Sequence, residues 1–143
     1  MLSHRDRNEI EVLDQDTCLG LLASEPLGRV AFLEAGAPRI LPVNHLVDGR
    51  SVVFRSALGA KLDAAERNRA MAFEVDRYDG SQGTGWSVLL TGLAEVVDDA
   101  DEIARLGELG LRSWAMGPEH DPQWVRIRIE EISGRWAGRD EDA

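Results

Sequence analysis

The segment from Gly28 to Ser56, GRVAFLEAGAPRILPVNHLVDGRSVVFRS, carries the clearest structural pattern in the chain. Three apolar runs, at residues 28–35, 39–47 and 51–56, are separated by the turn formers of EAGAP and by Asp48-Gly49. An Asp-Gly pair between two apolar runs is a strong signal for a β-hairpin. The segment therefore predicts three consecutive strands joined by tight turns.

Three more strands are predicted downstream. Residues 71–76 alternate between apolar and polar side chains, and residues 86–97 form a longer apolar run that contains Gly92. A glycine inside a strand is typical of a bulge or bend. The last strand covers residues 124–132, and its alternation predicts which side chains are buried (Val125, Ile127, Ile129) and which are exposed (Arg126, Arg128, Glu130).

Helices are expected at three places, with loops between the elements. One covers about residues 15–24 after a cap at Asp14 or Asp16, and one covers about 100–110 after a cap at Asp98 or Asp99. Apolar residues at helical spacing predict a third at about residues 59–68. Residues 77–85 and 113–123 are rich in turn formers or lack periodicity, and we expect loops there.

Six strands joined mainly by hairpin turns predict a mainly antiparallel, mainly β protein. A sheet of this kind can close on itself, so the expected fold is a small six-stranded Greek-key barrel with a few helices. The 143 residues suit one domain, 1–143, with residues 1–12 and 138–143 expected to be flexible.

Composition limits the possible partners. The formal net charge is −10, which argues against nucleic acid or an anionic membrane surface as a partner. No apolar run is long enough for a membrane span, and the charged N-terminus does not resemble a secretory signal. The only cysteine is Cys18, so a reducing, cytoplasmic setting is expected. Three histidines and one cysteine show no ligand spacing, so no metal site is predicted.

The segment FRSALGAKLD, residues 54–63, has the chemistry of a phosphate site. It runs from a strand end into a helix start, where free backbone N–H groups and a partial positive charge favour anions. Arg55 adds a fork of donors, Ser56 a hydroxyl and Lys61, the only lysine, a point charge. The alternative is an ordinary helix start with two solvated cations.

Several segments together resemble one known family: PVNHLVDG, VVFRSALGAKLDAAERN, FEVD, GWSVLLTGLAEVVDD and VRIRIEEISGR. In order and spacing they are similar to the flavin-binding split barrels related to pyridoxamine 5′-phosphate oxidase, and most similar to the short nitroimidazole-resistance-like branch. The resemblance covers about residues 14–137 and implies that the six-stranded antiparallel Greek-key barrel is a split barrel of the FMN-binding type. True pyridoxamine-phosphate oxidases carry a C-terminal Arg/His pair that this chain lacks, so oxidation of vitamin B6 is not expected.

The resemblance implies a set of cofactor contacts and a homodimer. It implies that Arg55, Ser56 and Lys61 hold the phosphate of FMN and that residues 42–44 (Pro42, Val43, Asn44) contact the isoalloxazine ring. The partner subunit would line the other side of the ring with residues 86–88 (Trp86, Ser87, Val88) and with Trp136. The cofactor would then lie at the subunit interface.

The resemblance also implies an FMN-dependent oxidoreductase that acts on a small electrophile such as a quinone or a nitro compound. No catalytic acid or base is identified. The alternatives are a deazaflavin-dependent reductase and a non-catalytic module that binds FMN or haem. A haem site would need an axial ligand, for which His45 is the plausible strand residue.

Overall fold

In a computed structural model of the chain, the described residues are 2–5, 10–57, 69–111 and 123–138. They form two helices and nine strands. In chain order these are β1 (Leu2–Arg5), β2 (Ile10–Leu13), α1 (Gln15–Ser24), β3 (Leu27–Glu34), β4 (Ala37–Asn44), β5 (Leu46–Val47), β6 (Ser51–Ser56), β7 (Arg69–Asp79), β8 (Thr84–Val96), α2 (Ala100–Gly107) and β9 (Gln123–Ala137).

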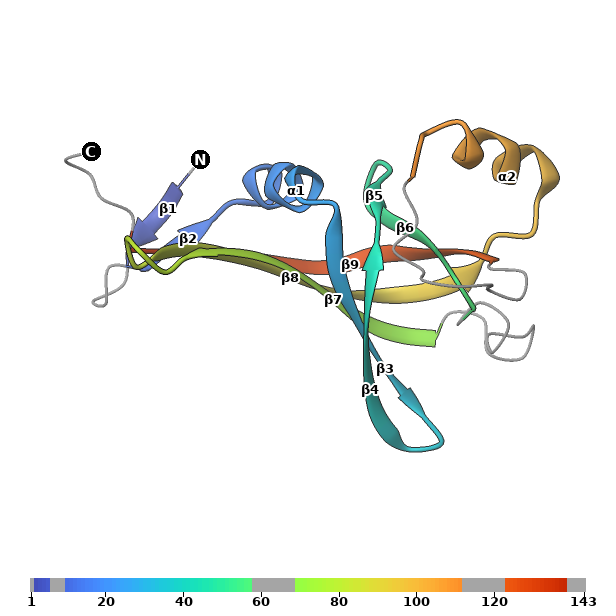
Figure 1. Ribbon diagram of the computed structural model, residues 1–143, viewed down its shortest axis with the longest axis horizontal. Coiled ribbons are helices and arrows are strands. Elements are labelled where there is room, and N and C mark those ends of the chain that lie inside the picture. Colours follow the sequence, from blue (N-terminus) through green and yellow to red (C-terminus); the bar gives the residue numbers. More distant parts are fainter. Residues whose placement is uncertain (1, 6–9, 58–68, 112–122, 139–143) are drawn as a thin grey trace.

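All the strands pair in an antiparallel manner within one curled sheet. Its order is β1-β2-β9-β8-β7-β3-β4, and β6 pairs with the other half of β9 and with β5. The long strands β7, β8 and β9 form a meander, while the β3–β4 hairpin projects from the body of the molecule (Figure 1). Among the described residues, β4 and β6 lie near each other but are not paired, so the barrel is split between them.

The first half of the structure follows the sequence prediction closely. Helix α1 covers residues 15–24, and the Asp14 carboxylate accepts a hydrogen bond of 2.8 Å from the Thr17 amide. Strand β6 has the predicted bounds, and Gly49 takes a φ of +64° in the turn that joins β5 to β6. The predicted strand 39–47 is divided in two, because the chain turns at His45 between β4 and β5.

Two predictions about the strands were wrong, and two strands were not predicted. Residues 1–12, which were expected to be flexible, include β1, which pairs with β2, and most of β2, which pairs with β9. Strands β7 and β9 run several residues beyond the predicted ends, because each continues to pair with β8. Arg126 was expected to be exposed, yet only 8% of its surface is accessible. The predicted helix at 59–68 and nearly all of the 113–123 loop lie outside the described residues.

The main core lies between the concave face of the sheet and α1. Strands β3, β6, β7, β8 and β9 contribute most of the buried side chains, β2 and β4 add Leu13 and Val43, and α1 adds Cys18 and Leu22. Gly28 allows β3 to approach this core closely, since a Cβ there would lie 2.4 Å from the Phe73 ring. A second, smaller cluster joins α2 to the other side of β6 and β9 through Leu106, Val53 and Trp124.

Gly92 creates the predicted irregularity in β8. The register between β8 and β9 shifts between Thr91 and Gly92, and a Cβ at Gly92 would lie 1.9 Å from the Arg128 carbonyl oxygen. A bulge of this kind bends a strand and increases its twist. The sheet can therefore curl around the core at this point. In the part of the chain that is described, no helix has the length and apolar character needed to cross a membrane.

Candidate functional site

The end of β6 presents Arg55 and Ser56 as the sequence predicts. Arg55 is exposed and lies over its cross-strand neighbour Trp124, with the guanidinium carbon 5.7 Å from the ring centroid. A cation placed over an indole face in this way is held in position without using its hydrogen-bond donors. Within the described residues Arg55 has no carboxylate partner, so its donors are available to an anion. Lys61, the third expected phosphate ligand, lies outside the described residues.

The three expected ring contacts at the end of β4 have different environments. Pro42 is exposed, Val43 is buried in the core, and the Asn44 side chain donates a hydrogen bond of 3.2 Å to the Pro26 carbonyl oxygen. A ligand beside this strand would therefore meet the Pro42 ring and the backbone, whereas the Val43 side chain faces the other way.

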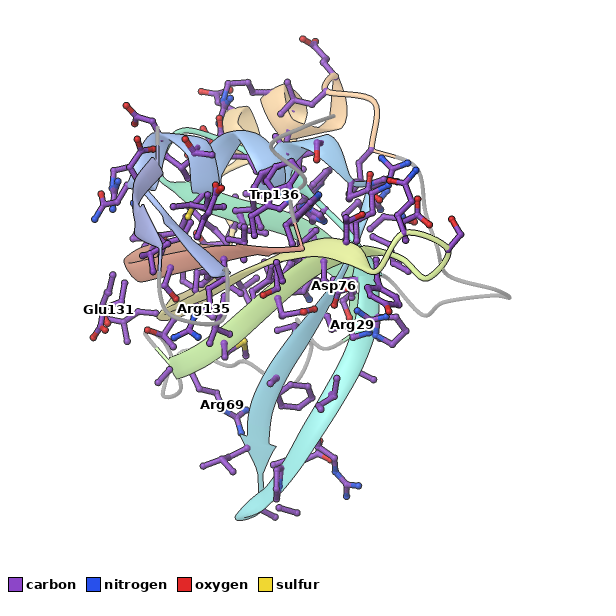
Figure 2. All side chains as sticks on the ribbon, turned by 90° about the vertical axis from the view of Figure 1, so that its left-hand side faces the viewer. Arg29, Arg69, Asp76, Glu131, Arg135 and Trp136 are labelled. Atoms are coloured by element: carbon purple, nitrogen blue, oxygen red, sulfur yellow. The ribbon has the colours of Figure 1, made fainter. Side chains whose placement is uncertain are left out.

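The four residues expected to act from the partner subunit lie on both faces of the sheet. Trp86 and Trp136 are direct cross-strand neighbours on β8 and β9 and are half-buried against the core. Val88 points the same way and is fully buried, but Ser87 is exposed on the opposite face. Figure 2 shows Trp136 on the helix-covered side of the sheet and Arg29, Asp76 and Arg135 on the other.

The two groups of expected cofactor residues are far apart within one chain. Arg55 pairs with Trp124 near the start of β9, and Trp86 pairs with Trp136 near its end. At about 3.3 Å per residue, the strand between Trp124 and Trp136 is roughly 40 Å long. Figure 1 shows these ends of β9 at opposite sides of the molecule. One flavin mononucleotide cannot span this length, so both groups can contact one cofactor only if they come from different copies of the chain.

His45 is part of the core rather than of an open site. It is 4% exposed, its Nε2 lies 2.8 Å from the Leu22 carbonyl oxygen, and its ring packs edge-on against Phe73 at 5.0 Å between centroids. Because the carbonyl can only accept, Nε2 donates, and Nδ1 has no hydrogen-bond partner among the described residues. Burial lowers the pKa of the imidazole. A haem iron could reach this ring only if the core opened.

A cluster of charges on the convex side of the sheet was not predicted from the sequence. Arg29 Nη1 on β3 lies 3.3 Å from Glu74 Oε1 and 3.4 Å from Asp76 Oδ2, both on β7. The three side chains line a hollow of about 340 Å³ together with apolar groups that include Ile40, Ala72 and Leu89. Burial, together with the hydrogen bond that the protonated Glu74 donates to the neighbouring Asp76 carboxylate, raises the pKa of Glu74 to about 7. Alternation along β7 places both carboxylates on one face, but only the pairing of β3 with β7 brings Arg29 between them.

A second hollow, of about 460 Å³, lies between α2 and the β5–β6 turn, where ion pairs surround it. The nearly buried Arg126 donates hydrogen bonds to Asp48, Ser51 and Glu102, and Arg105 on α2 binds the same two carboxylates. Each guanidinium is matched by acidic groups, so the cluster joins α2 to the barrel. Within the described residues, no three His, Cys, Asp or Glu side chains are placed to hold a metal ion.

Comparisons with known proteins identify the fold and its relatives. A family model for pyridoxamine 5′-phosphate oxidase matches residues 14–136. The Mycobacterium tuberculosis protein Rv0080 is 45% identical over 118 residues, which are 78% of this chain and 76% of that protein.

Two solved structures are similar in both sequence and shape. One, from Corynebacterium glutamicum, is provisionally assigned as a pyridoxamine 5′-phosphate oxidase; it is 35% identical with a TM-score of 0.77, over 89% of this chain and 97% of that one. The other, described as the FAD binding protein from Mycobacterium smegmatis, is 34% identical with a TM-score of 0.70, over 88% and 96% of the two chains.

Proposed function

The chain belongs to the pyridoxamine 5′-phosphate oxidase-like family, and on that premise we propose that it is a flavin-binding oxidoreductase whose cofactor site is shared by two subunits. FMN is the proposed cofactor and a small electrophile the proposed substrate. The observation that carries the proposal is the state of Arg55, which is exposed, held over Trp124 and not paired with a carboxylate of the described residues.

An arginine in this state suits the terminal phosphate of a mononucleotide. Its planar fork can bind two phosphate oxygens at once, and charge-assisted hydrogen bonds of this kind are about twice as strong as neutral ones. Ser56 follows directly, and we propose that Lys61 completes the group. A bound flavin supplies the transfer of hydride or electrons, while the protein binds it and orients it.

The two-subunit arrangement is supported by the length of β9. Arg55 and Ser56 would bind the phosphate in one subunit, while Ser87 of the second subunit would lie beside the ring; Trp136 of that subunit is on the other face of the sheet, packed against the core. The protein would therefore be a homodimer with two equivalent sites. The single cysteine, Cys18, is buried and unpaired, which suits the proposed cytoplasmic location.

Two other cofactors compete with FMN. The Mycobacterium smegmatis relative is described as binding FAD, and a deazaflavin coenzyme would also present a phosphate to Arg55. A role as a flavin-binding module without catalysis is the second candidate, because no described acid or base lies beside Arg55. A haem module is less well supported, since His45 is buried under α1 with Nε2 already in a hydrogen bond.

Calorimetric titration of the apoprotein tests the phosphate site. FMN should bind much more tightly than riboflavin, and Arg55→Ala should weaken FMN binding by about ten- to a hundredfold while riboflavin binding barely changes. Lys61→Ala should have a similar but smaller effect. The matched control is Arg128→Ala, which removes an exposed arginine on β9 that is paired with Glu95. Equal affinities for FMN and riboflavin would contradict the proposal, and parallel titrations with FAD and a deazaflavin would rank the cofactors.

Mixed dimers test whether the site is shared. Ser87→Arg should block the ring side of the site and Arg55→Ala should weaken the phosphate side, so neither homodimer should bind FMN well. A mixed dimer of the two variants keeps one site with both residues intact. It should bind one FMN per dimer with wild-type affinity, and no recovery of binding would show that the two residues act in one subunit. Reduction of the bound flavin by NADPH would then separate an enzyme from a binding module.

A further inference from the structure

One face of the sheet is left uncovered by the described helices. It is formed by β3, β4, β7 and β8, and we call it the outer face; its side chains are Arg29, Ala31, Ile40, Pro42, Ala72, Glu74, Asp76, Ser87 and Leu89. Helix α1 packs on the opposite, concave side, and α2 packs beside β6. Ile40 is 66% exposed and Leu89 is 49% exposed, and neighbouring large apolar side chains exposed in this way are typical of an interaction surface.

The Arg29, Glu74 and Asp76 cluster lies at the centre of the outer face. Arg29 and Glu74 are direct cross-strand neighbours, and Asp76 is the next residue along the same face of β7. These side chains are one-third to one-half exposed, so they are still partly solvated in a single chain. Figure 2 shows Arg29 beside Asp76 on the side of the sheet away from Trp136.

The cluster is continuous with the proposed cofactor site. Pro42 is the cross-strand neighbour of Arg29, and Ser87 is that of Asp76. One row of side chains therefore runs from an expected ring contact on β4, through the charge cluster, to an expected ring contact on β8. A second chain that completes the cofactor site must approach this row.

We propose that loss of the Glu74 proton weakens the dimer described above, in which the outer face would contact the second copy of the chain. The inference rests on the two-subunit site proposed above. A second copy suits this face because apolar side chains surround its centre and because it carries charges of both signs. Arg29 is positive and Glu74 and Asp76 are negative, while Arg135 and Glu131 lie beside the face on β9. A surface of that composition can pair with itself, as a two-fold interface requires.

The charge of the cluster explains the dependence on the proton. With Glu74 protonated, Arg29 and Asp76 balance each other, whereas ionised Glu74 leaves one negative charge in each copy. Among the described residues, Arg29 on β3 and Asp76 on β7 are the only charged groups that face Glu74 directly. The neighbouring strand β8 presents Leu89 and Ser87, and β4 presents Ile40 and Pro42. The nearest charged residues on β9 are Arg135 and Glu131.

Docking would remove water from Glu74, and this desolvation favours its protonated form. The pKa of Glu74 is already raised to about 7 in the single chain, so it would be higher still in the dimer. The dimer then binds more protons than two separate chains near neutral pH. By linkage, its dissociation constant must increase as the pH rises through this range.

Sedimentation equilibrium of the apoprotein from pH 6 to pH 8 tests the inference. The dimer dissociation constant should increase by about ten- to a hundredfold over this range. Glu74→Gln should dimerise at least as tightly as the wild type at pH 6 and should lose the pH dependence. Asp101→Asn is the matched control, since it removes one exposed carboxylate from α2, away from the outer face, and should keep the wild-type profile.

Two further variants should move the midpoint in opposite directions. Asp76→Asn removes the like charge beside Glu74 and should shift the midpoint to lower pH, whereas Arg29→Gln removes the opposite charge and should shift it to higher pH. Leu89→Arg should give a monomer throughout the range. A wild-type dissociation constant that does not change with pH, a Glu74→Gln variant that retains the dependence, or a Leu89→Arg variant that still dimerises would each overturn the inference.

The result is separable from the test of flavin binding. A chain that binds FMN between two subunits and dimerises equally at all pH values would leave the proposed function intact and remove only the role of Glu74. A dimer whose dissociation constant depends on pH, but which binds no flavin, would keep the role of Glu74 and remove the proposed function.

Discussion

Arg126 on β9 donates a hydrogen bond of 2.9 Å to Asp48 in the turn before β6. The two residues are 78 positions apart in the chain, and Arg126 is 8% exposed. Arg105 on α2 binds the same carboxylate at 2.6 Å. The Asp48-Gly49 turn is therefore both a hairpin signal in the sequence and an anchor for α2 in the folded protein.

Replacing Arg126 should destabilise the protein strongly. Arg126→Ala removes the nearly buried donor of Asp48, Ser51 and Glu102 and leaves only the more exposed Arg105 for the two carboxylates, and we expect it to lower the free energy of unfolding by about 2–3 kcal/mol. Arg128→Ala removes the neighbouring exposed arginine, whose side chain is 66% accessible, and should cost less than about 0.5 kcal/mol. Urea denaturation at pH 7 measures both, and equal costs would show that burial of Arg126 is not the cause.

Protonation of Asp48 at acidic pH should weaken its ion pairs with Arg105 and Arg126 and so destabilise the protein. Its hydrogen bond with Arg105 lowers the pKa of Asp48 from its ordinary value of 3.8, and Arg126 acts in the same direction. Because the folded-state pKa is the lower one, the stabilisation is complete above about pH 4 and is lost as the pH falls through the folded-state value. Asp48→Asn should be less stable than the wild type at pH 7, and its stability should depend less on pH between 5 and 2. Identical profiles for the two proteins would contradict this.

His45 should make the free energy of unfolding depend on pH in a higher range than Asp48 does. Burial lowers the pKa of the imidazole below its ordinary 6.5, so the unfolded chain takes up a proton that the folded chain resists. Stability is therefore complete above about pH 6.5 and falls below it, by at most about 1.4 kcal/mol per pH unit. His45→Gln, whose amide can still donate to Leu22, should be less stable at pH 8 but should lack the decline from pH 6.5 to 5. Thermal unfolding monitored across this range provides the measurement.

Two glycines should respond oppositely to the same substitution. At Gly92 a methyl group would collide with the Arg128 carbonyl, and Gly92→Ala should cost about 2–3 kcal/mol because the bulge must shift. Gly20 lies within α1, and no neighbouring atom lies within 4 Å of the place that a Cβ would occupy there. Gly20→Ala should therefore stabilise the protein by about 0.5–1 kcal/mol, as measured by urea denaturation. A comparable loss in both variants would show that α1 at Gly20 is not as the structure describes it.

Local chemistry was sufficient to predict the elements that depend on nearby residues. Asp14 predicts the start of α1, Asp48-Gly49 predicts the hairpin before β6, and Gly92 predicts the bulge in β8, because caps, turns and bulges are set by backbone conformation over a few residues. The ends of β7 and β9 were not predictable in this way. Those strands continue because β8 pairs with them, and the sequence does not show which strand lies beside them.

The burial of Arg126 also could not be predicted from the local sequence. Alternation correctly places it on the face opposite Val125 and Ile127, but α2 then covers that face through Leu106 and the ion pairs of Arg105. A period-two pattern predicts which residues share a face, and only the packing of other elements decides whether that face meets solvent.

Short-range patterns in the sequence were enough to predict a mainly antiparallel barrel and to place Arg55 and Ser56 at one strand end. The tertiary structure decides which residues lie far apart and which lie close together. It separates Arg55 from Trp136 by the length of β9, and it inserts Arg29 between Glu74 and Asp76. Strand pairing creates these relationships, and pairing depends on residues that are distant in the chain, so no local pattern contains them.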